Sequence, residues 1–240
     1  MTPPRKGRLS GAQRDFAARV NHTLRGDLNA LRQALELARE SLASGNRNDP
    51  LAEMERAVAR IERRALDIAL LTQADAGTLT HDLNRQPTSL RATIAEAIQA
   101  AQPLATMYDV ELAADLGACD TVEANLDGAL IARALGALIE NAIRYTREGG
   151  RVTVSAELGG ESGALARITI TDQGPGFPPS ATDRLLAPFA VGDRSGRLGL
   201  GLAVARAILE AHGGQLRLTN SGERGSGAIV IAELPLESSR

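Results

Sequence analysis

The sequence predicts an α+β protein in which an N-terminal helical hairpin precedes a larger mixed domain. Apolar residues recur at spacings of three and four over residues 17–42 and 51–68, as in amphipathic helices. Runs that alternate apolar and polar residues follow residue 150, as in strands with one buried face. A length of 240 residues accommodates two such unequal parts, because domains typically run about 100–200 residues.

The hairpin is predicted from two apolar series separated by the breaker SGNRNDP at residues 44–50. The first comprises Val20, Leu24, Leu28, Leu31, Leu35, Ala38 and Leu42. The second, with the strict alternation of a coiled-coil seam, comprises Leu51, Met54, Val58, Ile61, Ala65 and Ile68. Two helices alone cannot bury both stripes, so we expect residues 12–76 to form a homodimer, as a four-helix bundle with a second copy.

The second domain is expected at residues 88–236, after a linker at residues 77–87 that lacks periodicity and ends in proline. Helical patterns cover about residues 88–104 and 126–146. The β-rich runs are RVTVSAEL at 151–158, ARITITD at 166–172, GQLRLTN at 214–220 and AIVIAELP at 228–235. Because these runs have one polar face, a mostly antiparallel sheet with helices on its other face is predicted.

Composition excludes several classes of protein. The net charge of -2, with dispersed arginines, does not indicate a nucleic-acid-binding surface. The single Cys119 has no cysteine partner for a zinc site, so any metal must be held by oxygen atoms. No uncharged apolar run approaches the ~18 residues of a membrane span, and the start MTPPRKGRLS lacks the apolar stretch of a signal peptide. We therefore expect a cytoplasmic chain without a membrane segment.

The first chemically informative stretch is LIENAIRYT at residues 138–146. Its Asn141, Arg144 and Tyr145 are three and four residues apart, so a helix brings an amide, a cation and an aromatic ring to one side. Such a face suits a metal ion, a phosphate and a base. An ordinary polar helix end explains the stretch equally well when it is taken alone.

Two glycine-rich stretches extend this pattern. In TDQGPGF at 171–177, Asp172 follows a strand, and its carboxylate can accept a hydrogen bond from an exocyclic amine beside Gly174 and Gly176. In GRLGLGLAVARAILEAHGG at 196–214, Gly199 and Gly201 open a helix whose free N–H groups suit phosphate oxygens. A plain turn after a strand is the alternative for the first stretch, and a Gly-x-Gly pair alone is weak. The order and spacing of the three stretches strengthen the interpretation.

Together these motifs resemble the sensor histidine kinases, whose ATP-binding domain belongs to the gyrase, Hsp90, histidine kinase and MutL superfamily. The matching segments are ENAIRYT, DQGPGF, LLAPF, GLGLAVARAILEAHGG, GSGA at 225–228 and VNHTLRGDL. They span the chain from about Phe16 to Pro235. The resemblance implies an α/β sandwich ATP-binding domain of the histidine kinase/Hsp90 type, with ATP and Mg2+ as cofactors.

The resemblance also implies a role for each motif residue. Asn141 coordinates the Mg2+ that bridges the phosphates, Arg144 lies near those phosphates, and Tyr145 lines the nucleotide pocket. Asp172 accepts from the adenine amino group. The remaining implied nucleotide-binding residues, on the pocket floor and in a lid starting near Ala190, are Gly174, Gly176, Gly199, Leu200, Gly201 and Leu202. Mg2+ fits this set, because it prefers oxygen ligands and keeps several waters.

His22 lies in VNHTLRGDL, where the family has its phosphoacceptor histidine. At 100° per residue it points about 160° away from the apolar stripe of its helix, so it is expected to face solvent. An unremarkable surface histidine is the alternative when the helix is considered alone. With an ATP-binding domain downstream, the resemblance implies that His22 accepts the γ-phosphoryl group and passes it to an aspartate of a response regulator receiver domain.

The chain departs from the family pattern at several positions. Thr23, Gly26 and Asp27 occupy the acidic, Thr/Asn and Pro positions of the histidine box. Ala137 replaces the first asparagine of the ATP-binding helix, and Arg197-Leu198 precedes the glycine pair. The acidic neighbour normally orients or deprotonates the imidazole. The rate of autophosphorylation, phosphatase activity and nucleotide binding therefore remain open from the sequence.

Three functions are compatible with these residues. The leading one is an ATP-dependent protein-histidine kinase that autophosphorylates His22. The alternative is a degenerate, dimeric phosphotransfer or docking module with weak or no ATP-dependent activity. A serine kinase or ATP-driven clamp leaves the helical hairpin and its outward histidine unexplained. The sequence leaves open the input signal, the cognate regulator, transfer within or across the dimer, and whether the chain is a fragment of a longer kinase.

Overall fold

A computed structural model describes residues 28–29, 31–33, 35–36, 50–160, 164–178, 182–188, 199–222 and 227–236 of the chain. The chain divides into two compact units, residues 1–68 with 191–199 and residues 69–190 with 200–240. His22, the other residues of the histidine box up to Asp27, and residues 190–198 of the expected lid lie outside the described residues.

The described part of the first unit is helical. Residues 28–29, 31–33 and 35–36 are helical, as the first apolar series predicts, and α2 (Pro50–Asp75) contains the second series. On the predicted seam of α2, Met54, Ile61 and Ile68 are half-buried, whereas Val58 is 41% exposed. Within one chain the seam is therefore only partly covered. The helix ends just before Gly77, which adopts a φ of 70° and donates its N–H to the Ala74 carbonyl.

The second unit is built on a five-stranded sheet with the order β2-β4-β5-β7-β6. Its strands are β2 (Glu111–Asp115), β4 (Arg151–Gly159), β5 (Leu165–Thr171), β6 (Gln215–Asn220) and β7 (Ala228–Pro235). The β2–β4 pair is parallel and the other pairs are antiparallel, which confirms the predicted mostly antiparallel sheet. A separate antiparallel pair of β1 (Gln86–Ser89) and β3 (Glu123–Leu126) was not predicted.

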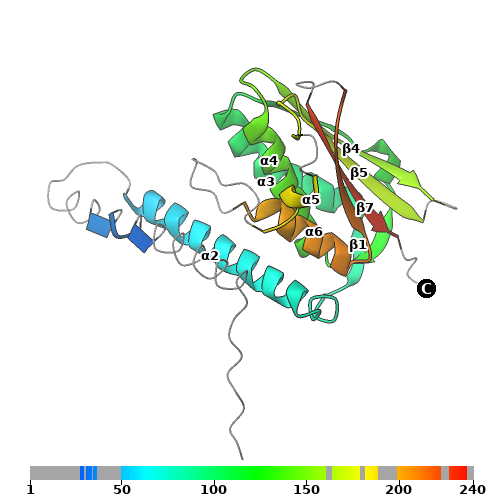
Figure 1. Ribbon diagram of the computed structural model, residues 1–240, viewed down its shortest axis with the longest axis horizontal. Helices are drawn as coiled ribbons and strands as arrows, with labels where there is room; N and C mark the ends of the chain where they lie inside the picture. Colours follow the sequence, from blue (N-terminus) through cyan, green and yellow to red (C-terminus); the bar gives the residue numbers. More distant parts are fainter. Residues whose placement is uncertain are drawn as a thin grey trace, which may run out of the picture. The chain divides into compact units, whose positions relative to one another are not determined.

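Figure 1 shows α3 (Leu90–Met107), α4 (Gly128–Tyr145) and α6 (Gly201–Ala211) covering one face of this sheet. The short elements η1 (Gly117–Cys119) and α5 (Thr182–Leu185) complete the unit. Asp127 caps the start of α4 by accepting from the Leu130 N–H. The residues of α4 buried in the helical layer are Ile131, Ala132, Ala134, Leu135, Leu138, Ile139, Ala142 and Ile143. Helix α4 thus packs centrally, between α3 and α6.

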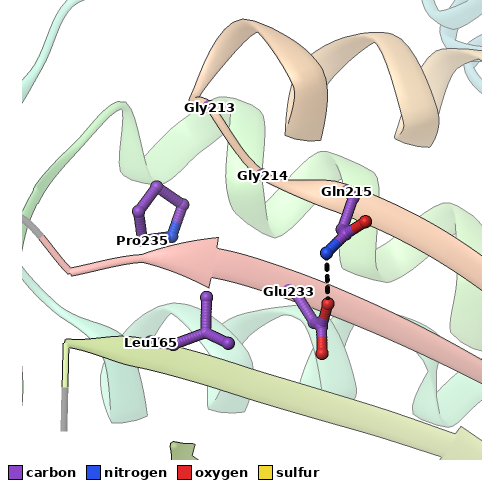
Figure 2. Close-up of a pocket in the computed structure, with 6 residues that line it drawn as sticks. All are labelled: Leu165, Gly213, Gly214, Gln215, Glu233 and Pro235. Carbon is purple, nitrogen blue, oxygen red and sulfur yellow. Dashed lines mark hydrogen bonds between the residues drawn. The ribbon is translucent and has the colours of Figure 1, made fainter. Parts of the chain in front are cut away.

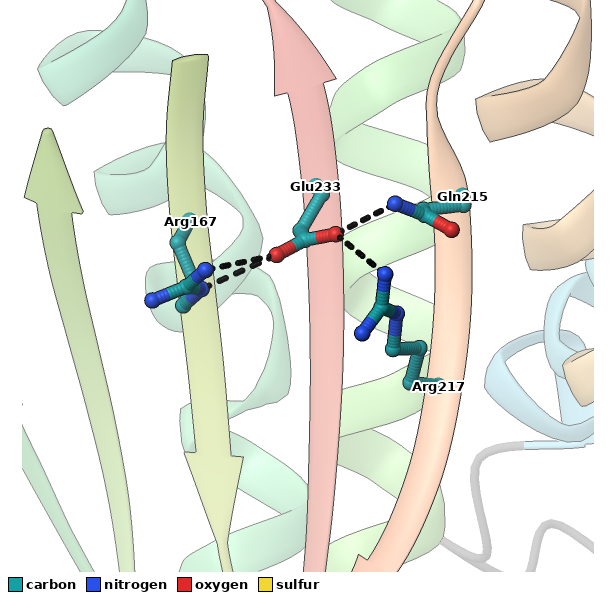
Figure 3. Close-up of polar contacts among 4 residues, drawn as sticks. All are labelled: Arg167, Gln215, Arg217 and Glu233. Atoms are coloured by element: carbon teal, nitrogen blue, oxygen red, sulfur yellow. Dashed lines mark hydrogen bonds and ion pairs between the residues drawn. The ribbon is translucent and has the colours of Figure 1, made fainter. Parts of the chain in front are cut away.

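The opposite face of the sheet is polar and carries a charged cluster that spans β5, β7 and β6 (Figure 3). Glu233 on β7 is only 3% exposed. Its Oε1 accepts from Nε and Nη2 of Arg167 at 3.0 and 2.9 Å, while its Oε2 accepts from Gln215 at 2.6 Å and lies 3.6 Å from Arg217. A buried carboxylate is tolerated only when it is paired, and strand register supplies the partners, because Arg167 and Gln215 lie directly opposite Glu233.

Candidate functional site

Asp172 is a buried carboxylate whose orientation is fixed by backbone hydrogen bonds. It directly follows β5 and is 5% exposed. Its Oδ1 accepts from the N–H groups of Gly174 at 2.8 Å and Ala228 at 3.0 Å, and its own N–H donates to the Ala228 carbonyl. Within the described residues no group donates to Oδ2. One oxygen therefore anchors the side chain, and the other is available to a ligand donor.

Glycines allow the backbone around Asp172 to pack closely. A Cβ atom on Gly174 would lie 2.5 Å from the Tyr145 carbonyl oxygen at the end of α4. A Cβ atom on Gly227 would lie 2.0 Å from the Asp172 carbonyl oxygen, and Gly227 has a φ of 106°. The loop after β5 thus lies directly against the end of α4, and this contact joins the second predicted motif to the first.

Asn220 at the end of β6 holds the remainder of this loop. Its Oδ1 accepts from the Phe177 N–H at 2.7 Å and its Nδ2 donates to the Phe177 carbonyl at 3.0 Å. Gly176, with a φ of 73°, lies so close that a Cβ atom would be 2.8 Å from the Asn220 Oδ1. The sequence interpretation missed Asn220, because one asparagine at a strand end gives no motif. The GSGA segment did include Gly227.

The predicted residues of α4 lie on its last turns. Asn141 is half-buried, and its side-chain amide makes no hydrogen bond to any other residue described in the structure, so its oxygen is uncommitted. Tyr145 is 38% exposed. Arg144 donates from Nη1 to the Tyr108 hydroxyl at 3.1 Å, and its Nη2 is 4.0 Å from a Glu140 oxygen. Arg144, expected near phosphates, is thus held by a residue that no motif included.

The start of α6 is the third predicted motif. Gly199 has a φ of 61°, and Leu200 is the N-cap residue but supplies no side-chain acceptor for the first N–H groups of the helix. A Cβ atom on Gly201 would lie 3.7 Å from Cβ of Ala137, and Leu202 is half-buried. Ala137 and Tyr145 are roughly 12 Å apart along α4, with Asn141 midway. The Asp172 loop and the helix start therefore meet α4 at two separate points.

His212, outside the predicted site, has a structural role. It is 2% exposed, and its Nε2 accepts from the Asp127 N–H at 3.1 Å while Nδ1 lies 2.8 Å from the Ile208 carbonyl, to which it must donate. Both bonds require the neutral ring, and burial lowers the pKa of His212. Asp127 also accepts from the Asn84 N–H at 3.0 Å. This cluster joins the end of α6 to the start of α4 and to the chain preceding β1.

A cavity of about 240 Å³ lies at the other end of the sheet (Figure 2). Its lining residues are Leu165, Gly213, Gly214, Gln215, Glu233 and Pro235. Leu165 is seven residues before Asp172, so the cavity is about 23 Å from Asp172 along β5. Its carboxylate, Glu233, already accepts from Arg167 and Gln215. We therefore assign the candidate site to Asp172 and the end of α4.

The described residues contain no group of three or more His, Cys, Asp or Glu residues that could hold a metal ion. Within the same residues, no helix has both the length and the apolar character that a membrane crossing requires.

Known proteins similar to this chain include ATP-binding domains and histidine kinases. Residues 126–238 match the family described as histidine kinase-, DNA gyrase B- and HSP90-like ATPase. The chain is 32% identical over 229 residues to the sensor protein DivL of Caulobacter vibrioides, which covers 93% of this chain and 28% of DivL. It is 29% identical over 230 residues to the signal transduction histidine-protein kinase BaeS of Escherichia coli K12, covering 94% of this chain and 47% of BaeS. The chain thus spans less than half of either relative.

Solved structures share the fold. The Acinetobacter baumannii histidine kinase AdeS aligns with a TM-score of 0.65 at 24% identity, covering 90% of this chain and 98% of that chain. Full-length ShkA, solved in complex with AMPPNP, aligns with a TM-score of 0.68 at 23% identity, covering 94% of this chain and 46% of that chain. Residues 126–238 therefore form a histidine kinase-, DNA gyrase B- and HSP90-like ATPase domain, and over nearly its whole length the chain is similar to a sensor protein and a histidine-protein kinase.

Proposed function

We propose that this chain is an ATP-dependent protein-histidine kinase that autophosphorylates His22 and transfers the phosphoryl group to an aspartate of a response regulator receiver domain. The observation that carries the proposal is the arrangement of Asp172. Its Oδ1 is fixed by the N–H groups of Gly174 and Ala228, and its Oδ2 is left for a donor such as the adenine amino group. A buried carboxylate held in this way selects a ligand that carries an N–H group.

The rest of the nucleotide is assigned to neighbouring groups. Asn141, whose amide oxygen accepts no hydrogen bond from any described residue, can offer that oxygen to Mg2+, which when bound neutralises charge on the phosphates. The first N–H groups of α6, which lack a side-chain acceptor at Leu200, suit phosphate oxygens. Tyr145 is partly exposed beside the Asp172 loop, where its ring can cover the base. Gly174 and Gly176 keep the pocket floor free of side chains.

The proposed reaction needs little covalent chemistry from the domain. A ring nitrogen of His22 attacks the γ-phosphorus, the bond to the β,γ-bridging oxygen breaks, ADP leaves, and the imidazole loses a proton to solvent. A receiver carboxylate then attacks the phosphorus, and His22 is released. Positioning and charge neutralisation supply most of the catalysis in such transfers.

We also infer that the working form is a cytoplasmic homodimer. The support is the predicted seam of α2, on which Val58 is 41% exposed and Ala65 is also exposed within one chain. Exposed side chains of this kind on a coiled-coil seam are covered by pairing with a second helix. The similarity to a protein named a signal transduction histidine-protein kinase supports a response regulator as the second partner.

The test is incubation of the full chain with γ-labelled ATP and Mg2+, followed by an acid-lability assay. Wild type should acquire acid-labile phosphate, whereas His22→Gln should bind ATP and acquire none. Asn141→Ala should also acquire none, because its Mg-ATP is poorly held. In a mixed dimer of the two variants, label on the Asn141→Ala chain indicates transfer across the dimer.

A second function is favoured by the atypical histidine box, in which Thr23, Gly26 and Asp27 replace the usual residues. In that case the chain is a dimeric docking or phosphotransfer module with weak or no ATP-dependent activity. A wild-type chain that binds ADP and a receiver domain, but never labels His22, would support the module and refute the kinase.

A further inference from the structure

Tyr108, at the end of α3, contacts Arg144 in two ways. Its hydroxyl accepts a hydrogen bond from Arg144 Nη1 at 3.1 Å, and the Arg144 guanidinium carbon lies 5.6 Å from the centre of its ring. The second distance is within the range of a cation–π contact. Tyr108 is 37% exposed and the Arg144 side chain 27% exposed, so the pair lies at the surface while remaining partly shielded from water.

The backbone holds both residues of this pair in place. Tyr108 is the C-cap residue of α3, and Asp109 follows it with a φ of 51°, a left-handed conformation that ends the helix. The Gly149 N–H donates to the Asp109 carbonyl at 2.8 Å, and the Glu111 N–H donates to the Gly150 carbonyl at 2.9 Å. These two bonds join the turn after α3 to the turn after α4. The backbone segments next to Tyr108 and Arg144 are therefore hydrogen-bonded to each other, which limits the movement of one residue relative to the other.

Among the residues that the structure describes, the contact leaves most of the Arg144 donors without a hydrogen-bond acceptor. A guanidinium carries five N–H groups, and the Tyr108 hydroxyl takes one of them. Glu140 is 4.0 Å away, which exceeds a hydrogen-bond distance, so it balances charge without occupying a donor. Arg144 follows Asn141 by three residues, which places both side chains on the same side of α4. The fixed guanidinium can thus meet an anion beside a metal ion held by Asn141.

We propose that Tyr108 is a positioning residue for the nucleotide phosphates, which acts by holding the Arg144 guanidinium ready to bind them. This inference rests on the proposed function. A free arginine side chain loses rotamer entropy when it binds, and a side chain already held in place loses less. Tyr108 should therefore strengthen the binding of ligands that carry phosphates and leave the binding of adenosine unchanged.

Calorimetry on the full chain with Mg2+ tests this, using adenosine and ADP as ligands. Tyr108→Leu removes both contacts and should weaken ADP binding roughly five- to tenfold, while Tyr108→Phe removes only the hydrogen bond and should have about half that effect in free energy. Met107→Ala is the matched control, because Met107 is the adjacent residue and is 78% exposed. It should bind both ligands as wild type does.

A double-mutant cycle separates positioning from a general structural role. In an Arg144→Gln background, Tyr108→Leu should have no further effect on ADP binding. Equal ADP affinity in wild type and Tyr108→Leu, a higher affinity in Tyr108→Leu, or an equal loss for adenosine and ADP would overturn the inference and leave the proposed function standing. A wild-type chain that binds neither ligand would overturn both.

Discussion

Replacing Asp172 with asparagine changes one atom of the site in a defined orientation. The Asp172 Oδ1 accepts two backbone N–H groups, from Gly174 and Ala228. In Asp172→Asn only the amide oxygen can accept those bonds, so the amide nitrogen must take the place of Oδ2. The position that offers an acceptor in the wild type then presents an N–H group. The substitution thus reverses the polarity of the ligand-facing atom while keeping its neighbours in place.

The expected loss follows from the bond that disappears. A hydrogen bond to a charged acceptor contributes about 1.5–3 kcal/mol, so adenosine affinity should fall roughly 10- to 100-fold. Inosine carries an exocyclic carbonyl oxygen in place of the adenine amino group, and it should be penalised less, because the new amide N–H can donate to that oxygen. The melting temperature should change little, since both anchoring bonds are retained.

Calorimetric titration of adenosine and inosine into wild type and Asp172→Asn measures both effects. Asp115→Asn, which alters an exposed carboxylate on β2, is the matched control and should leave both affinities unchanged. Unchanged adenosine affinity in a folded Asp172→Asn protein would refute the assignment of Asp172 as the base-reading residue. An equal loss for adenosine and inosine would show that the substitution damages the pocket without changing its polarity.

Two further predictions concern the helices. Ile61→Glu should convert the proposed dimer to monomers in sedimentation, because an unpaired charge in the bundle core costs about 3 kcal/mol or more. The control Ala59→Glu, on the exposed side of α2, should remain dimeric. A dimeric Ile61→Glu protein would show that Ile61 does not lie in the dimer interface. Burial lowers the pKa of His212 in the folded protein. As pH falls below about 6.5, His212 therefore takes up a proton in the unfolded chain before it does so in the folded protein. The free energy of unfolding should decrease over this pH range. His212→Gln should be less stable at pH 8, with a gap to wild type that narrows toward pH 5; a constant gap would show that His212 does not titrate on unfolding.

Local sequence patterns predicted the long elements of the second unit closely. The helix expected at 126–146 is α4, Gly128–Tyr145, since its apolar spacing and the Asp127 cap are properties of neighbouring residues. The predicted run at 228–235 coincides with β7. The strands β1, β2 and β3 were missed, because segments of four or five residues show too few alternations to be distinguished from linker.

The residues of the candidate site were also predicted only in part. Asn141, Asp172 and the glycines were predicted, because each motif is short and contiguous. Asn220 and Tyr108 were not, since they act on Phe177 and Arg144, which are 43 and 36 residues away in the chain. Nothing in the neighbourhood of Tyr108 indicates that it reaches a guanidinium on another helix.

The sequence by itself determined the helical periods, the strand alternation and the motifs that a nucleotide site requires, because these depend on interactions between residues close along the chain. Tertiary structure alone decided which oxygen of Asp172 is anchored by the backbone, and that Arg144 donates a hydrogen bond to Tyr108. The Asp172 Oδ1 is anchored partly by the N–H of Ala228, which is 56 residues away. Such contacts depend on how β5 and β7 pair and how α3 and α4 end side by side, and no local pattern encodes that packing.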